Sequence, residues 1–123
     1  MVAFWVFVGG GLGSLARFGI GKATSLIVST SFPLGTFISN ILACIILAVI
    51  VYLLPAKLIV EHSWLTPLMV IGFCGGFSTF SSFSYENVQL ISNGNTGLAI
   101  LNIVISLIVG IGVIFLFQQK SGI

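Results

Sequence analysis

Four apolar segments, each long enough to cross a bilayer, set the strongest limit on how this chain can fold. They cover roughly residues 2–24, 34–54, 64–91 and 97–117. A helix needs about 20 predominantly apolar residues to span the hydrocarbon core. Charged residues make up only 5% of the 123 residues, against about 25% in a soluble domain. The sequence therefore predicts an all-α membrane protein with four transmembrane helices in a single domain, residues 1–123.

The few polar and ionisable residues exclude several classes of function. The chain has no aspartate, and its only carboxylates are Glu61 and Glu86. With His62 as the single histidine, neither a catalytic triad nor a carboxylate pair can be assembled, so we do not expect an enzyme. A net charge of +2 is too small for a nucleic-acid-binding face. Cys44 and Cys74 lie in apolar segments and are expected to pack as small hydrophobic residues.

The basic residues give no preferred orientation in the membrane. Four spans place both termini and the second loop on one side, with Lys57 and Lys120; Lys22 and Arg17 lie toward the other side. Orientation normally follows the excess of Lys and Arg on cytoplasmic loops. A tally of two against two fits a chain that inserts in both orientations, and it also fits a small protein that simply has few charges. Copies of opposite orientation could pair about an axis in the membrane plane.

Four short helices enclose little space, so we expect copies to associate, and small residues at a spacing of four allow such close helix packing. The first segment contains Gly9 and Gly13, and the fourth contains Ser106 and Gly110. Such spacing lets two helix backbones approach each other within a membrane. The motif is common in membrane helices, so it predicts packing and carries no information about chemistry.

The third segment contains the stretch GFCGGFSTFSSFS, which predicts an interrupted helix. Gly72, Gly75 and Gly76 lower helix stability, by about 1 kcal/mol each. Ser78 and Thr79 follow, and both are good N-cap types. We expect the third helix to be broken near the middle of the membrane; a kinked packing helix is the alternative. A break exposes carbonyl groups that suit a cation and N–H groups that suit an anion.

Aromatic and hydroxyl side chains follow the expected break. Phe80 and Phe83 lie three residues apart and project to roughly the same side of a helix. The edge of an aromatic ring carries partial positive charge and can contact a small anion without holding it firmly. Ser81, Ser84 and Asn87 add hydroxyl and amide donors nearby.

Two other segments carry polar residues on one helical face. Thr36, Ser39 and Asn40 open the second segment at spacings of three and four, and Asn102 and Ser106 share a face of the fourth. Hydrogen bonding between helices explains many such residues. Because Asn40 lies closer to the middle of its segment and has a bulkier amide, we assign it to an ion pathway.

These motifs together resemble a known family. GGGLGSLARFGIG in the first segment, GTFISN in the second and GFCGGFSTFSSFSYE in the third are similar to the Fluc fluoride channels, also called CrcB proteins. The resemblance implies an antiparallel, dual-topology homodimer with two fluoride pores. It also implies passive export of fluoride from the cytoplasm of a prokaryote, and hence a location in the plasma membrane (the inner membrane of a Gram-negative cell).

The resemblance also implies roles for individual residues. Phe80 and Phe83 would be the pore phenylalanines, Asn40 the pore-lining amide, and the backbone carbonyls of Gly75 and Ser78 the ligands of a structural Na⁺ at the dimer interface. The remaining ion-pathway positions would be Arg17 in a polar vestibule, Ser81 and Glu86 near the pore, and Asn102 and Ser106 on a polar track. The family often has threonine where Ser78 stands and commonly has tyrosine at the position of Asn102.

Glu86 and Arg17 bear on the alternative functions. Glu86 could accept a hydrogen bond from a hydroxyl, pair with Arg17, or handle protons. A small dual-topology, proton-coupled drug or guanidinium transporter is the main alternative, but it needs a membrane carboxylate early in the chain, where this sequence has Arg17. A non-conducting assembly subunit is a second alternative, and it would tolerate leucine at both Phe80 and Phe83.

Overall fold

The computed structural model describes residues 1–122, which form an all-helical fold. Four of its helical segments are long and apolar enough to cross a membrane: Val2–Ile27, Leu34–Leu53, Thr66–Ser92 and Thr96–Ser121. The described part of the chain contains no β-strand. The prediction of four spans is confirmed, and the ends of the segments differ from the predicted ones by a few residues.

The first half of the chain forms two spans and a short connecting helix. Helix α1 (Val2–Ile27) is followed by α2 (Leu34–Ala48), which continues into the π-helical turn η1 (Val49–Leu53). The N–H of Leu54 donates to the carbonyl of Val49 over 3.2 Å and closes this wider turn. We expected the connection between the second and third spans to be a loop, but it contains helix α3 (Ala56–Glu61). This helix of six residues is too short to show a helical pattern in the sequence.

The third span consists of three helical pieces. The π-helical segment η2 (Thr66–Cys74) runs into α4 (Gly75–Phe77), and α5 (Phe80–Ser92) begins after two non-helical residues. These two residues are extended: Ser78 has φ −81° and ψ 158°, and Thr79 has φ −153° and ψ 116°. The hydroxyl oxygen of Thr79 accepts the N–H of Ser82 over 3.1 Å and caps α5, as its residue type favours.

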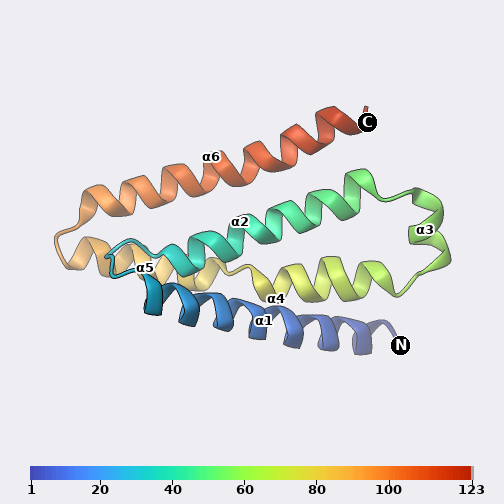
Figure 1. The fold of residues 1–123 in the computed structure, drawn as a ribbon, viewed down its shortest axis with the longest axis horizontal. Helices are drawn as coiled ribbons and strands as arrows, with labels where there is room; N and C mark the ends of the chain where they lie inside the picture. The colour runs from blue at the N-terminus through green and yellow to red at the C-terminus, as the bar shows by residue number, and fades with distance from the viewer. Residues whose placement is uncertain (123) are drawn as a thin grey trace.

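The spans lie side by side, with the last helix, α6 (Thr96–Ser121), at one edge. Helix α1 packs against η2 and α4, whereas α6 packs against α2 and α5. Both termini and α3 lie at the same end of the molecule (Figure 1). This end therefore carries Lys57 and Lys120, and the C-terminal part of α1, with Lys22, runs toward the opposite end.

Glycines set the separation between α1 and the third span. A Cβ added to Gly9 or Gly13 would collide with the carbonyl oxygens of Leu68 and Phe73 respectively. Two glycines of the third span are equally constrained, since a Cβ at Gly72 or Gly76 would collide with backbone atoms of α1. Gly9 and Gly13 therefore allow close packing, as their spacing predicts, but their partner is the third span of the same chain; association between copies stays a prediction.

Adding one methyl group at two nearby glycines of α1 is expected to have different effects on stability. Gly13→Ala forces the backbones apart and should lower the midpoint of thermal unfolding, with an overpacking cost of about 1–3 kcal/mol. Gly11→Ala is the matched control, because no atom lies within 4 Å of an added Cβ there, and it should leave the midpoint unchanged or raise it. Equal midpoints for both variants in detergent would contradict this packing.

Candidate functional site

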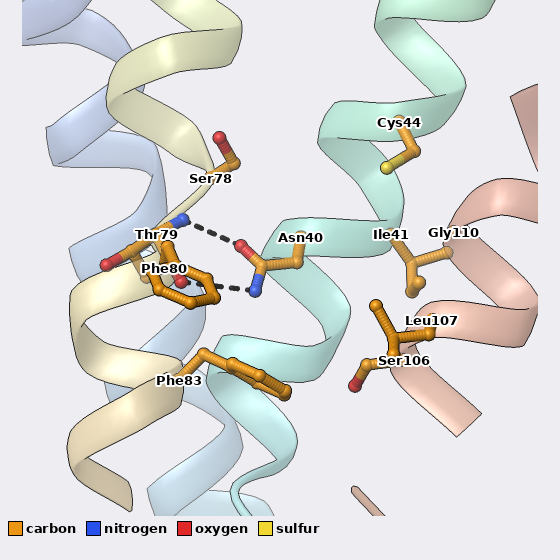
Figure 2. A pocket seen from close by; sticks show the side chains of 10 residues that line it. All are labelled: Asn40, Ile41, Cys44, Ser78, Thr79, Phe80, Phe83, Ser106, Leu107 and Gly110. Carbon is orange, nitrogen blue, oxygen red and sulfur yellow. Dashed lines mark hydrogen bonds between the residues drawn. The ribbon is translucent and has the colours of Figure 1, made fainter. Parts of the chain in front are cut away.

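A pocket of about 260 Å³ lies where the interruption of the third span faces α2 and α6 (Figure 2). Residues of all three elements contribute to its wall. They are Asn40, Ile41, Cys44, Ser78, Thr79, Phe80, Phe83, Ser106, Leu107 and Gly110. The wall is mainly apolar, with a few polar groups at defined positions, as in many binding sites for small ligands and ions.

Asn40 holds the extended backbone of the interruption. Its side-chain oxygen accepts the N–H of Thr79 over 2.7 Å, and its amide nitrogen donates to the carbonyl of Thr79 over 3.3 Å (Figure 2). One side chain thus satisfies both backbone groups of the non-helical residue. The amide nitrogen of Asn40 has a second N–H, which remains available at the pocket wall.

The N-terminus of α5 lies beside the same pocket. None of the hydrogen bonds of residues 1–122 involves the backbone N–H of Phe80 or Ser81, because the first N–H groups of a helix have no partner within it. Such free N–H groups, together with the helix dipole, favour an anion. Since α5 is 13 residues long, this is the terminus of a regular helix.

Phe80 and Phe83 form one wall of the pocket. Their ring centroids are 6.1 Å apart, with the ring planes inclined by 35°. Phe83 is half-buried, whereas Phe80 is 80% exposed in the single chain. The pocket is therefore open on the side of Phe80, where the single chain supplies no cover.

A chain of buried amides connects the two sides of the pocket. Asn87 donates from its side-chain nitrogen to the carbonyl of Phe83 over 2.8 Å, and Asn102 donates to the side-chain oxygen of Asn87 over 3.0 Å. The hydroxyl of Ser106 then donates to the side-chain oxygen of Asn102 over 3.2 Å. Both asparagines are buried. The predicted shared face of Asn102 and Ser106 is confirmed by this last bond.

Glu86 and Arg17 lie at a second site, away from the phenylalanines. The hydroxyl of Thr36 donates to one carboxylate oxygen of Glu86 over 2.7 Å, and the other oxygen is buried without a partner among the described residues. Arg17 donates from Nε to the carbonyl of Gly76 over 3.1 Å. Both side chains line a cavity of about 500 Å³ that also includes Lys22. Of the three roles considered for Glu86, the structure contains the hydrogen bond from a hydroxyl; within residues 1–122 the ion pair present is Lys57–Glu61.

The carbonyl groups of Gly75 and Ser78 are released by the interruption. In a continuous helix they would accept the N–H groups of Thr79 and Ser82. Those two N–H groups bind the Asn40 side chain and the Thr79 hydroxyl instead. In the part of the chain that the structure describes, neither carbonyl accepts another hydrogen bond. Gly75 and Ser78 both line a cavity of about 280 Å³. Carbonyl oxygens are among the ligands that a hard cation prefers.

The structure brings some of the predicted site residues together and separates others. Asn40, Phe80, Phe83 and Ser106 line one pocket, and Asn102 supports it from outside. Arg17 and Glu86 share the second cavity. Two further sets stand apart. Gly75 and Ser78 line a third cavity, and Ser78 also lines the first pocket. Ser81 is exposed, and its hydroxyl oxygen lies 3.3 Å from that of Thr79. Ser84 is half-buried.

Comparison with known proteins places the chain in a family. Residues 4–117 match the family described as "CrcB-like protein, Camphor Resistance (CrcB)". Three similar proteins are each named "Fluoride-specific ion channel FluC". The one from Azobacteroides pseudotrichonymphae genomovar. CFP2 is 39% identical, over 92% of this chain and 90% of its own length. That from Pyrococcus abyssi (strain GE5 / Orsay) is 42% identical over 90% and 88%, and that from Magnetococcus marinus (strain ATCC BAA-1437 / JCM 17883 / MC-1) 36% over 85% and 84%.

The match covers nearly all of the four spans, and it includes the interrupted third span and the residues that line the pocket between this span, α2 and α6. The chain therefore belongs to the CrcB-like family.

Proposed function

We propose that this protein is a fluoride-selective ion channel that lets cytoplasmic fluoride leave a prokaryotic cell passively, across its plasma membrane. The observation that carries the proposal is the pocket at the interruption, which is lined by the amide of Asn40 and by the rings of Phe80 and Phe83 and which lies beside the N-terminus of α5. The choice of fluoride as the transported ion comes from the names of the similar proteins. A channel needs no catalytic group, in keeping with the family to which the chain belongs.

The chemistry of the pocket suits a small, strongly hydrated anion. Fluoride loses water only where hydrogen-bond donors replace it, and the pocket offers the second N–H of Asn40 and the N-terminal amides of α5. The edges of Phe80 and Phe83 add weak electrostatic contacts. Several weak contacts in series let an ion both enter and leave. In our proposal the cavity around Arg17 and Glu86 is the aqueous vestibule that leads to this pocket.

The proposal includes an antiparallel homodimer with two pores. Lys57 and Lys120 lie at one end of the molecule, and Lys22 and, deeper in α1, Arg17 lie toward the other, so the basic residues give no strong preference for one orientation. Phe80 is 80% exposed and the pocket is open beside it. A second copy would supply the missing wall and complete the pore.

The proposal also includes a structural Na⁺ between the two copies. The released carbonyls of Gly75 and Ser78 would be its ligands, and the corresponding oxygens of a second copy would complete the set. When bound, the ion would supply positive charge that neutralises these carbonyl dipoles and so stabilises the association. Serine in place of threonine at position 78 leaves the carbonyl ligand unchanged.

An efflux assay on purified protein tests this function. Liposomes loaded with the potassium salts of fluoride and chloride, with a potassium ionophore to compensate the charge, should release fluoride rapidly and retain chloride, whether or not a pH gradient is present. The same preparation should have the mass of two copies, and replacing Na⁺ by a large organic cation should slow the efflux. Fluoride release that requires a proton gradient would indicate a coupled transporter, and no release would contradict the proposal.

A further inference from the structure

The amide chain behind the pocket has a direction that its chemistry determines. It begins at the carbonyl of Phe83, which can only accept a hydrogen bond. The side chain of Asn87 must therefore turn its NH₂ group toward Phe83 and its oxygen toward Asn102. Asn102 must then donate to Asn87, which leaves its own oxygen facing Ser106. Each amide is thus fixed by the group before it.

Because of this direction, the single hydroxyl proton of Ser106 is used in its hydrogen bond to Asn102. Because the oxygen of Asn102 can only accept, Ser106 must donate to it, over 3.2 Å. Ser106 lines the pocket beside Phe83, but its oxygen has only lone pairs left to present there. Lone pairs repel an anion and attract a water proton. In this arrangement Ser106 cannot donate directly to a permeating anion.

We infer that Asn87 and Asn102 are positioning residues that keep Ser106 a hydrogen-bond acceptor, so that Ser106 holds a water molecule at the pocket wall and contacts the anion through it. The inference rests on the proposed function. It differs from a direct donor role for Ser106. Neither asparagine lines the pocket, and Asn87 and Asn102 are only 5% and 1% exposed, so they act on the ion only through Ser106 and the carbonyl of Phe83.

Removing the first amide should reverse the polarity of Ser106. In Asn87→Leu, the amide of Asn102 loses the acceptor that orients it, and it can turn to donate to the Ser106 oxygen. The Ser106 proton is then free to face the pocket and bind the anion directly. We expect the fluoride concentration that half-saturates the current across a planar bilayer to fall several-fold. The change should disappear when Ser106→Ala is also present, because no proton remains to be released.

A second variant keeps the test independent of folding. Asn87→Leu with Asn102→Leu replaces both partners of the buried pair by apolar groups of similar size, which proteins tolerate better than the loss of one partner. Ser106 again loses its acceptor, so the same fall in half-saturating fluoride is expected, again only when Ser106 is present.

The outcomes separate this inference from the proposed function. If the amides had a purely structural role, the asparagine substitutions would lower the thermal stability and the current to the same extent with and without Ser106→Ala. They would not change the half-saturating fluoride concentration. That result would overturn the inference. Absence of any fluoride current from the unmodified protein would instead overturn the proposed function.

Discussion

Replacing Phe80 and Phe83 together by leucine is expected to reduce fluoride efflux by up to about a hundredfold. A favourable aromatic contact is worth about 0.5–1.5 kcal/mol. Losing two such contacts raises the barrier by up to about 3 kcal/mol, at about 1.4 kcal/mol for each factor of ten in rate. Leucine keeps the apolar character of both positions, so the protein should still fold and associate. The measurement is the initial rate of fluoride release from liposomes.

Phe115→Leu is the control for this pair. Phe115 is an exposed phenylalanine of α6 and does not line the pocket, so its replacement should leave the efflux rate unchanged. Unchanged efflux from the Phe80 and Phe83 double variant would place the pathway elsewhere. If neither the unmodified protein nor the double variant released fluoride, the result would favour a non-conducting assembly subunit.

Replacing Asn40 by leucine is expected to lower fluoride efflux at least about tenfold and to lower the midpoint of thermal unfolding. The substitution leaves the N–H and the carbonyl of Thr79 without their partners. Each unsatisfied buried group costs about 1–3 kcal/mol, so the extended conformation at the interruption loses its support. The pocket loses the free N–H of Asn40 at the same time.

Ser39→Ala is the matched control for Asn40. Ser39 is the preceding residue of α2 and is fully buried, but its hydroxyl donates only to the carbonyl of Gly35 in its own helix, over 2.9 Å. Its loss should change neither efflux nor stability by much. Equal effects of Ser39→Ala and Asn40→Leu would mean that the pairing of Asn40 with Thr79 is not what sustains transport.

The sequence was sufficient to predict the elements of the fold that depend on local pattern. Apolar length revealed the four spans, and residue type indicated that Ser78 or Thr79 could cap a helix, a role that Thr79 performs. Helical spacing placed Asn102 and Ser106 together, and their hydrogen bond confirms it. The depth of the interruption in a membrane, the ion-pathway roles and the Na⁺ ligands stay predictions.

Features that depend on distant residues could not be predicted from local patterns. Asn40 and Thr79 are 39 positions apart in the sequence. Nothing in either segment indicates that the side-chain amide of Asn40 binds both the N–H and the carbonyl of Thr79. Thr36, Ser39 and Asn40 were predicted to share one helical face, but their side chains have different hydrogen-bond partners in the fold. Thr36 reaches Glu86, whereas Ser39 bonds back to its own helix. The π-helical turns likewise leave no pattern in the sequence.

The most direct test of the central claim is the reversal potential of the current through a planar bilayer that contains the purified protein. With a fluoride gradient across the bilayer and equal chloride and pH on both sides, the current should reverse at the equilibrium potential of fluoride. Imposing a chloride gradient or a pH gradient should not move it. A reversal potential that follows chloride or protons would contradict a fluoride-selective channel.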